Sequence, residues 1–331
     1  MKTGKLSFVW NLVLMILPLV AAISCMGIGR MVLAPNEVLG ALLGGDVSDM
    51  VYKTIWNIRL PRIVLAMLVG GGLAAAGCAF QSLFANPLAT PDTLGVASGA
   101  SFGAALAILM GCSMVGIQLT SLAAGGAAVL LTWLGGSRKG NGLNTIVLSG
   151  IMMGSLFNAL VSMVKYIADA EDQLPAITFW LMGGLNSAGW KNIALGAPAV
   201  VVSVLTLWLL RWRLNLLPLT EDEARASGVN MKVLRGITIL CATLITASCV
   251  SMCGQVGWVG LLIPHICRMK FGSNHLALLP ASVSLGATFM VLVDTVARSA
   301  TAAEIPISIL TAIIGAPFFI VLMRRSGGWQ L

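Results

Sequence analysis

Charged residues are scarce in this sequence. Only 10% of its 331 residues are Asp, Glu, Lys or Arg, whereas 58% are hydrophobic. An average soluble domain carries about 25% charged and about 45–50% apolar residues. So few charges cannot cover the surface of a 34.5 kDa globule in water. The composition excludes a soluble enzyme, a disordered chain and a coiled coil, and it indicates an all-α polytopic membrane protein.

Motifs for catalysis and metal binding are also missing. Gly135–Gly140 lacks the spacing of a phosphate-binding loop, so we do not expect this chain to hydrolyse ATP by itself. His265 and His275 do not form a His-Glu-x-x-His pair, and the seven cysteines include no Cys-x-x-Cys pair. We expect no enzyme activity, no metal site and no cofactor bound by this chain. Its net charge of +8 is better explained by orientation in a membrane than by nucleic acid.

Long apolar runs are what the sequence has instead. A transmembrane helix needs about 20 such residues. The clear runs are 8–28, 63–83, 95–113, 115–134, 143–167, 193–210, 236–254, 276–297 and 306–323. A shorter run, 256–267, is a tenth span if Pro264 only bends it. The sequence therefore predicts one membrane domain over residues 1–331, with about ten transmembrane helices and no soluble appendage.

The first apolar run has two interpretations. Lys2 and Lys5 before an apolar stretch are compatible with a signal peptide, and Ala22–Cys25 faintly resembles a lipoprotein cleavage box. Uncleaved first helices have the same pattern. Because many further spans follow, we interpret this run as a retained first span.

The distribution of Lys and Arg predicts the orientation of the spans. Ten spans place both termini on one side, and with a cytoplasmic N-terminus 13 of the 20 basic residues fall inside. The outer seven are Arg30, Lys53, Arg59, Arg62, Lys165, Lys191 and Arg298. The positive-inside rule thus favours a multi-pass membrane protein with both termini cytoplasmic.

Three connections are longer than a turn. The outer loop 29–62 has room for a short surface helix at Pro35–Leu43. A second outer loop, 168–192, places Trp180 and Trp190 at interface depth. The third connection, 211–235, is charged and is predicted to be cytoplasmic.

This inner connection encodes a short helix at about 218–229. Thr220 is a suitable N-cap, the acidic residues that follow it suit the first helical turn, and Gly228 suits the end. By itself the segment is equally compatible with a solvated connector. However, its Glu-Ala-x-x-x-Gly core resembles the coupling loop of ABC import permeases. The residues concerned are Thr220, Glu221, Asp222, Glu223, Ala224, Arg225 and Gly228.

Five sequence blocks make a family resemblance specific. They begin with Arg59-Leu-Pro-Arg62 before a Gly/Ala-rich span and end with Gly315-Ala-Pro-Phe-Phe319. In order and spacing the blocks closely resemble the FecCD family, permeases for ferric siderophores, haem and vitamin B12, over about residues 30–325. The motif positions that we expect to be structural are Gln81, Asn86, Pro87, Pro91, Gly95, Gly257, Gly260, Pro264, His265, Arg268, Asp294, Glu304, Pro306, Gly315 and Pro317.

The resemblance departs from the family pattern at three positions. Ser308 stands where a glycine is usual, Trp258 stands where the family usually has phenylalanine, and Thr220 stands where glycine is common. These differences affect local packing and leave the class unchanged.

The resemblance implies a location in the bacterial inner membrane, a fold and a set of partners. The fold is that of BtuC-like type II ABC importer permeases. The partners are a second permease copy or a paralogue, two ABC ATPase subunits that bind ATP and Mg, and an extracytoplasmic substrate-binding protein. Arg59, Arg62 and Arg298 match family positions that meet acidic residues of the binding protein, and the coupling helix is expected to enter a cleft of the ATPase.

Other interpretations of these features stay open at this point. Arg59 and Arg62 also suit lipid-headgroup anchoring, and Arg298 also suits an ion pair with Asp294 one helical turn away. As the substrate, an iron-siderophore complex is favoured over vitamin B12 or haem. The competing functional class is an ATP-independent secondary transporter or channel. Such proteins often carry intramembrane charges and broken-helix ion sites, which are not evident in this sequence.

Overall fold

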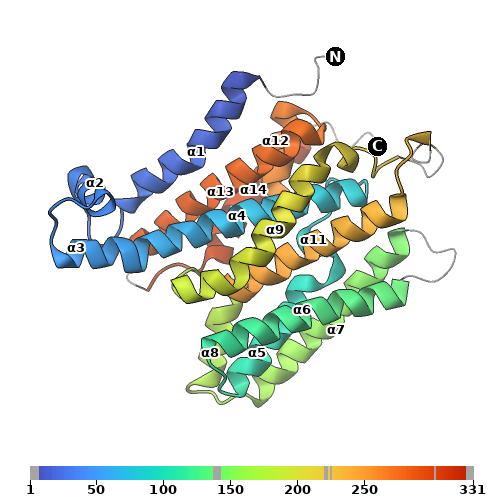
Figure 1. Ribbon diagram of the computed structural model, residues 1–331. Coiled ribbons are helices and arrows are strands. Elements are labelled where there is room, and N and C mark those ends of the chain that lie inside the picture. The colour runs from blue at the N-terminus through green and yellow to red at the C-terminus, as the bar shows by residue number, and fades with distance from the viewer. Residues whose placement is uncertain (1–6, 137–142, 220–222, 224–225, 302, 326–331) are drawn as a thin grey trace.

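The computed structural model describes residues 7–136, 143–219, 223, 226–301 and 303–325 (Figure 1). Within these ranges all regular structure is helical. The elements are α1 (Phe8–Met26), α2 (Pro35–Leu43), α3 (Asp49–Lys53), the π-helical η1 (Thr54–Arg59), α4 (Leu60–Leu83), the 3-10 helix η2 (Pro91–Leu94), α5 (Val96–Leu109), α6 (Met114–Gly136), α7 (Leu143–Ile167), α8 (Gln173–Leu181), α9 (Trp190–Leu214), α11 (Met231–Cys253), α12 (Val259–Phe271), α13 (His275–Ala300) and α14 (Ile307–Arg325).

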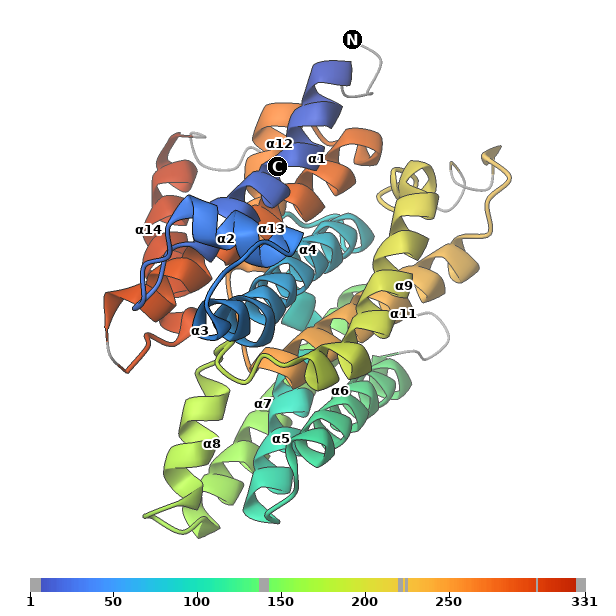
Figure 2. The same cartoon turned by 60° about the vertical axis from the view of Figure 1, so that its left-hand side comes forward.

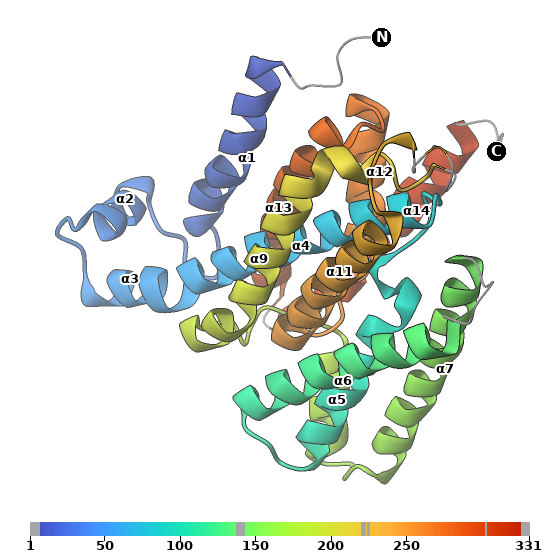
Figure 3. The ribbon, with the colours of Figure 1, turned by 45° about the vertical axis from the view of Figure 1, so that its right-hand side comes forward.

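Seven helical stretches among the described residues are long and apolar enough to cross a membrane. They are α1, the continuous stretch Asp49–Leu83, α6, α7, α9, α11 and α13. The apolar helix α5 is shorter, the apolar part of α14 is limited to Ile307–Val321, and α12 has only 13 residues. The polytopic all-α class is therefore confirmed, whereas ten complete crossings stay a prediction. In Figure 3, α1 begins and α14 ends at the same, upper side of the bundle, as an even number of crossings requires.

The predictions for the connections 29–62 and 168–192 and for Pro264 have different outcomes. The surface helix predicted at Pro35–Leu43 is confirmed as α2. Pro264 lies inside α12, which continues past it to Phe271. The connection 168–192, predicted as an outer loop, contains the additional helix α8. Nine residues are too few to cross a membrane, and α8 carries Pro175 in its first turn, where proline is tolerated.

The centre of the bundle is α4. Figure 2 shows α5, α6, α7 and α8 grouped on one side of the molecule and α1, α12, α13 and α14 on the other, with α4, α9 and α11 between them. Most residues of α4 are buried, including the glycines and alanines from Gly70 to Gly77. A helix of such small residues lets its neighbours approach closely on every side, which places α4 at the core.

Glycine contacts set the distance between α4 and α13. A Cβ added at Gly70 would overlap the carbonyl oxygen of Gly286, and one added at Gly286 would overlap that of Gly70. On the other side of the bundle, a Cβ at Gly103 of α5 would lie 2.7 Å from the Cβ of Ala124 in α6. These glycines and alanines therefore allow the helices to pack closely.

Candidate functional site

A cluster of five charged residues lies where α4 begins, α13 ends and the α13–α14 connection passes. Its members, which we call the arginine cluster, are Arg59, Arg62, Asp294, Arg298 and Glu304. Arg59, Arg62 and Arg298 are only 4%, 7% and 7% exposed. The three arginines predicted to act together are thus at one end of the bundle, and their side chains are buried among protein atoms.

Arg62 is the centre of the cluster. Its Nε donates to Asp294 Oδ1 at 2.8 Å and to Oδ2 at 3.1 Å. Its Nη1 donates to Glu304 Oε2 at 2.9 Å and to Oε1 at 3.2 Å. One guanidinium therefore connects α4, α13 and the connection that leads into α14 through charge-assisted hydrogen bonds.

The other two arginines bind backbone carbonyls at the end of α1. Arg298 donates from Nη2 to the carbonyl of Cys25, and its Nε lies 3.9 Å from Asp294 Oδ2. The pairing of Arg298 with Asp294 is therefore present but loose, and Arg62 is the closer partner of that carboxylate. Arg59 donates to the carbonyls of Met26 and Met31. The cluster fastens α1 and the segment after it to the rest of the bundle.

Glu304 is the one acid of the cluster that is partly accessible. Its side chain is 28% exposed, against 1% for Asp294. Its φ of 54° is uncommon for a residue with a side chain. Two hydrogen bonds hold the segment beside it, from Ile305 N to the Ala297 carbonyl at 3.1 Å and from Ile307 N to the Gly183 carbonyl at 3.0 Å. The backbone is thus held in a form that directs Glu304 to Arg62.

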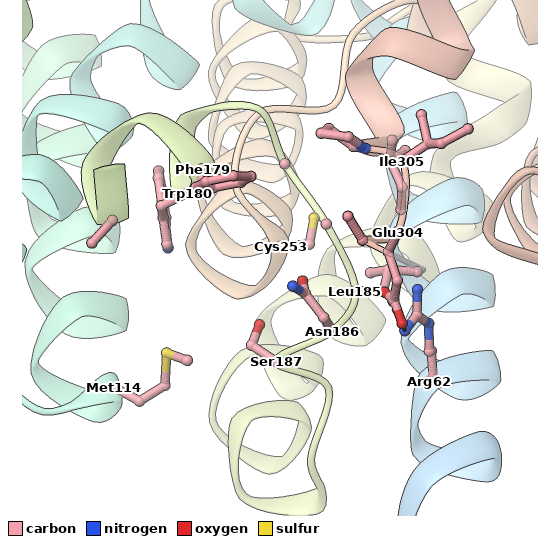
Figure 4. Close-up of a pocket in the computed structure, with 16 residues that line it drawn as sticks. Arg62, Met114, Phe179, Trp180, Leu185, Asn186, Ser187, Cys253, Glu304 and Ile305 are labelled. Carbon is pink, nitrogen blue, oxygen red and sulfur yellow. Dashed lines mark hydrogen bonds and ion pairs between the residues drawn. The ribbon is translucent and has the colours of Figure 1, made fainter. Parts of the chain in front are cut away.

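A cavity of about 380 Å³ opens beside Arg62 and Glu304 (Figure 4). We call it the outer cavity because it lies at the end of the bundle that the sequence predicts to face outward. Figure 4 shows the two charged side chains on one wall and Phe179 and Trp180 of α8 across from them. Asn186 and Ser187 also line the cavity, from the segment between α8 and α9. Sequence reasoning missed these two residues. The only signal for a turn there was Gly183-Gly184, and nothing local indicated that the turn borders a cavity.

A second polar network lies at the opposite end of α4. Arg268 Nη2 donates to Gln81 Oε1 at 2.8 Å, and Gln81 Nε2 donates to the carbonyls of Leu261 at 3.4 Å and Gly260 at 3.5 Å. Three motif residues predicted from distant blocks, Gln81, Gly260 and Arg268, therefore meet at the contact of α4 and α12.

A hydrogen-bond chain that the sequence did not predict extends from this network toward the 211–235 connection. Ser82 Oγ lies 2.6 Å from His275 Nε2, and His275 Nδ1 lies 3.0 Å from Asn215 Oδ1. Asn215 Nδ2 donates to Asn274 Oδ1 at 3.1 Å. Asn215 therefore ties the end of α9, just before the predicted coupling helix, to the start of α13 and the end of α4.

The motif residues between α4 and α5 shape a turn. Asn86 Oδ1 accepts a hydrogen bond from Leu88 N at 2.9 Å across Pro87. Pro91 occupies the first position of η2. Gly95 joins η2 to α5 with a φ of 74°, which a residue with a Cβ rarely adopts.

The later motif residues pack around α12 and α14. The ring of His265 lies 5.7 Å from that of Phe319, at an edge-on angle of 63°. A Cβ at Gly315 would lie 2.8 Å from the indole ring of Trp258, so this glycine makes room for the residue that departs from the family pattern. The remaining positions lie in or beside these helices: Gly257 precedes α12, Pro264 is inside it, Pro306 precedes α14 and Pro317 is inside α14.

The predicted coupling residues are only partly described. Thr220, Glu221, Asp222, Ala224 and Arg225 lie outside the described residues. Glu223 is exposed and helical, and its carbonyl accepts a hydrogen bond from Ser227 Oγ at 3.3 Å. Gly228 follows with a φ of 69°, as expected of a glycine that ends a helix.

Among the residues that the structure describes, no three His, Cys, Asp or Glu side chains lie close enough together to hold a metal ion. The bonds of the arginine cluster and of the Gln81–Arg268 network join helices of this chain to one another.

Comparison with known proteins places this geometry in context. A model of the FecCD transport family matches residues 15–325. The molybdate import system permease protein of Haemophilus influenzae is 42% identical over 318 residues, which cover 94% of each chain. The Fe(3+) dicitrate transport system permease protein of Escherichia coli is 37% identical, over 87% of this chain and 88% of that protein. A solved inward-facing structure of a metal-chelate type ABC transporter superimposes with a TM-score of 0.87, at 42% identity, and covers 94% of this chain and 97% of that one.

Proposed function

The chain belongs to the FecCD transport family, and from this membership we propose that it is the transmembrane permease subunit of an ATP-driven ABC importer. The observation that carries the proposal is the 42% identity with an import permease over 94% of both chains. In this function the chain binds no cofactor. ATP and Mg are bound by two separate ATPase subunits, and an extracytoplasmic binding protein delivers the substrate.

The substrate that we propose is a metal compound small enough to pass between two permease copies. Sequence reasoning favoured an iron-siderophore complex, with vitamin B12 or haem as alternatives. The relative with 42% identity is a molybdate permease, and the one with 37% identity carries Fe(3+) dicitrate. Molybdate and a ferric chelate are therefore the first two substrates to test.

The exposed face of α7 supports a path at the interface of two copies. Ser155, Asn158 and Ser162 recur on this face at helical spacing, and all three are exposed. The hydroxyls of Ser155 and Ser162 donate to the carbonyls of Ile151 and Asn158 within α7, so the Asn158 amide is the group on this face that most needs a polar surrounding. We propose that these three residues line the path between this chain and a second copy or a paralogue.

Uptake into proteoliposomes tests the proposed function. The permease, its ATPase and the binding protein are reconstituted together, and the entry of labelled molybdate or ferric chelate is measured with and without ATP on the ATPase side. We expect uptake only when all three proteins and ATP are present. Uptake by the permease without the ATPase would instead support an ATP-independent transporter.

The coupling segment gives the first variant for this assay. Combining Glu223→Lys with Gly228→Pro reverses an exposed charge and alters the backbone at a φ of 69° that proline cannot adopt. We expect at least tenfold less ATP-driven uptake, while membrane insertion and yield stay unchanged. The control is Glu171→Lys, at an exposed acid in the connection between α7 and α8. Equal uptake by the coupling variant and the control would argue against an ATPase contact here.

A proposal for how the binding protein docks has to explain how it reaches arginines that are buried. We propose that an acidic residue of the binding protein reaches Arg62 through the outer cavity and takes the place of Glu304. Asp294 stays on Arg62 Nε, whereas Glu304 is partly exposed and can be displaced. Arg59 and Arg298 then support the site by holding the end of α1.

The variant Glu304→Gln tests this exchange. It removes the competing charge but keeps the size of the side chain, so the binding protein should associate more tightly, by up to about fivefold for a partly exposed ion pair. The affinity of the cognate binding protein for the permease in nanodiscs is the measurement, with Glu171→Gln as the matched control. If the Glu304→Gln permease bound the binding protein no more tightly than the Glu171→Gln control does, the exchange would be contradicted.

A further inference from the structure

A long apolar groove runs between α1 and α9. Its floor is formed by α4 and α13, and Figure 3 shows α1 and α9 on either side of these two helices. The groove has a volume of about 630 Å³, and Leu14, Pro18, Met67, Leu205, Trp208 and Val283 are among the residues that line it.

The groove offers almost nothing to a polar ligand. Its one hydroxyl, that of Ser284, donates to the carbonyl of Leu14 and is therefore already satisfied. Along α13 the lining extends from Pro280 to Ala287, about 10 Å at the rise of an α-helix. A dry apolar groove of this kind, open between two helices, suits a hydrocarbon chain.

At the end of each wall of the groove, a basic side chain lies over a tryptophan ring. On α9, the guanidinium of Arg211 lies 4.0 Å from the ring centroid of Trp208. On α1, Trp10 precedes Leu14 by about one turn, and Lys270 Nζ lies 4.4 Å from its ring centroid. Both cations lie toward the end of the bundle where α1 begins and α9 ends. Stacking on a ring orients a cation and leaves N–H groups free for an anion.

No carboxylate neutralises these two cations within the described part of the chain. Arg211 Nη1 donates to the carbonyl of Trp208 at 2.8 Å, a neutral acceptor. The exposed Arg213 adds a further positive charge to the same end of α9. The mouth of the groove is therefore positive on both walls, beside tryptophans of the kind that lie at membrane interfaces.

We propose that the groove binds an anionic phospholipid, with one acyl chain between α1 and α9 and the phosphate at the Arg211 and Lys270 end. The groove supplies apolar contact for the chain, and the two cations supply selectivity for a negative headgroup. The site depends on insertion in a membrane and not on which substrate is imported. With cytoplasmic termini, the lipid belongs to the inner leaflet.

Native mass spectrometry of the purified full-length permease tests the proposal. The protein is titrated in detergent with phosphatidylglycerol or phosphatidylcholine of identical acyl chains, and the occupancy of bound lipid is compared. We expect phosphatidylglycerol to bind at least tenfold more tightly, at about fivefold per cation near a membrane surface. Equal binding of the two lipids by the wild type would overturn the proposal.

Two pairs of variants test separately how the lipid headgroup and the acyl chain contribute to binding. Combining Arg211→Ala with Lys270→Ala should abolish the preference for phosphatidylglycerol and leave the binding of phosphatidylcholine unchanged, whereas Arg213→Ala should retain most of the preference. Leu205→Trp, at a groove residue, should weaken both lipids, whereas Leu209→Trp, at an exposed residue one turn along α9, should weaken neither. A preference that survives the loss of both cations, or competition by inorganic phosphate alone, would contradict a lipid site.

Discussion

Replacing Asp294 with alanine is expected to prevent the folded permease from accumulating. The Asp294 side chain is 1% exposed and is the partner that Arg62 Nε contacts at 2.8 Å. Without this carboxylate, Arg62 and Arg298 stay buried, and only Glu304 offsets their positive charge. Removing one partner of a buried ion pair costs about 3–5 kcal/mol, which is a large fraction of the roughly 5–15 kcal/mol that stabilises a typical fold. Yield and the thermal unfolding midpoint in detergent are the measurements.

The matched control for this variant is Glu304→Ala, which removes the other carboxylate on Arg62. Because Glu304 is partly exposed, its loss should cost only about 1 kcal/mol or less. Asp294→Asn keeps a hydrogen-bond acceptor for Arg62 and should fall between the two. If Asp294→Ala and Glu304→Ala had the same unfolding midpoint, the buried pair would not be the main support of this end of the bundle.

A methyl group at Gly77 is expected to have the second large effect. In Gly77→Ala the new Cβ would overlap the carbonyl oxygen of Gly260 and lie 2.8 Å from its Cα. Backbone atoms cannot rotate away as a flexible side chain can, so α4 and α12 must separate. Overpacking of this kind costs about 1–3 kcal/mol or more. The carbonyl of Gly260 also accepts from Gln81, so the contact of Gln81 with Arg268 should weaken at the same time.

Gly126→Ala is the control for this second variant. Gly126 lies inside α6, and a Cβ added there meets no atom within 4 Å. The same substitution should therefore be neutral, or stabilising by about 0.5–1 kcal/mol, since alanine is the better helix former. The comparison uses the unfolding midpoints of the two variants. Equal midpoints would show that the α4–α12 contact tolerates expansion.

Local patterns predicted much of the fold. Apolar runs located the spans, because the bilayer imposes one length on all of them. The bounds of α2 followed from Pro35 at the first position and a stop at Gly44, which adopts a φ of 78°. The close approach of Gly70 to Gly286, in contrast, is a contact between distant segments that the structure shows.

The ion pairs and the burial of the arginine cluster could not be predicted from local patterns. Arg62 and Asp294 are 232 positions apart, and no periodicity relates them. The sequence therefore indicated arginines at an outer end but not that they are buried. Likewise, Ser82, His275 and Asn215 meet only because three helix ends converge, and each residue is unremarkable in its own segment. The helix α8 was missed because its nine residues carry no apolar run of membrane length.

The arginine contacts at the end of α1 have a consequence for how the chain is made. Cys25 is among the first residues to leave the ribosome, but Arg298, which donates to its carbonyl, follows 273 positions later. At about 5–20 residues per second, translation separates the two by roughly 14–55 s. During that interval the end of α1 lacks the Arg298 contact and is held by lipid and by earlier contacts such as that of Arg59 with the Met26 carbonyl. The contact of α1 with α13 is thus among the last to form, and a nascent chain that stops short of α13 fastens the end of its first helix through Arg59 without Arg298.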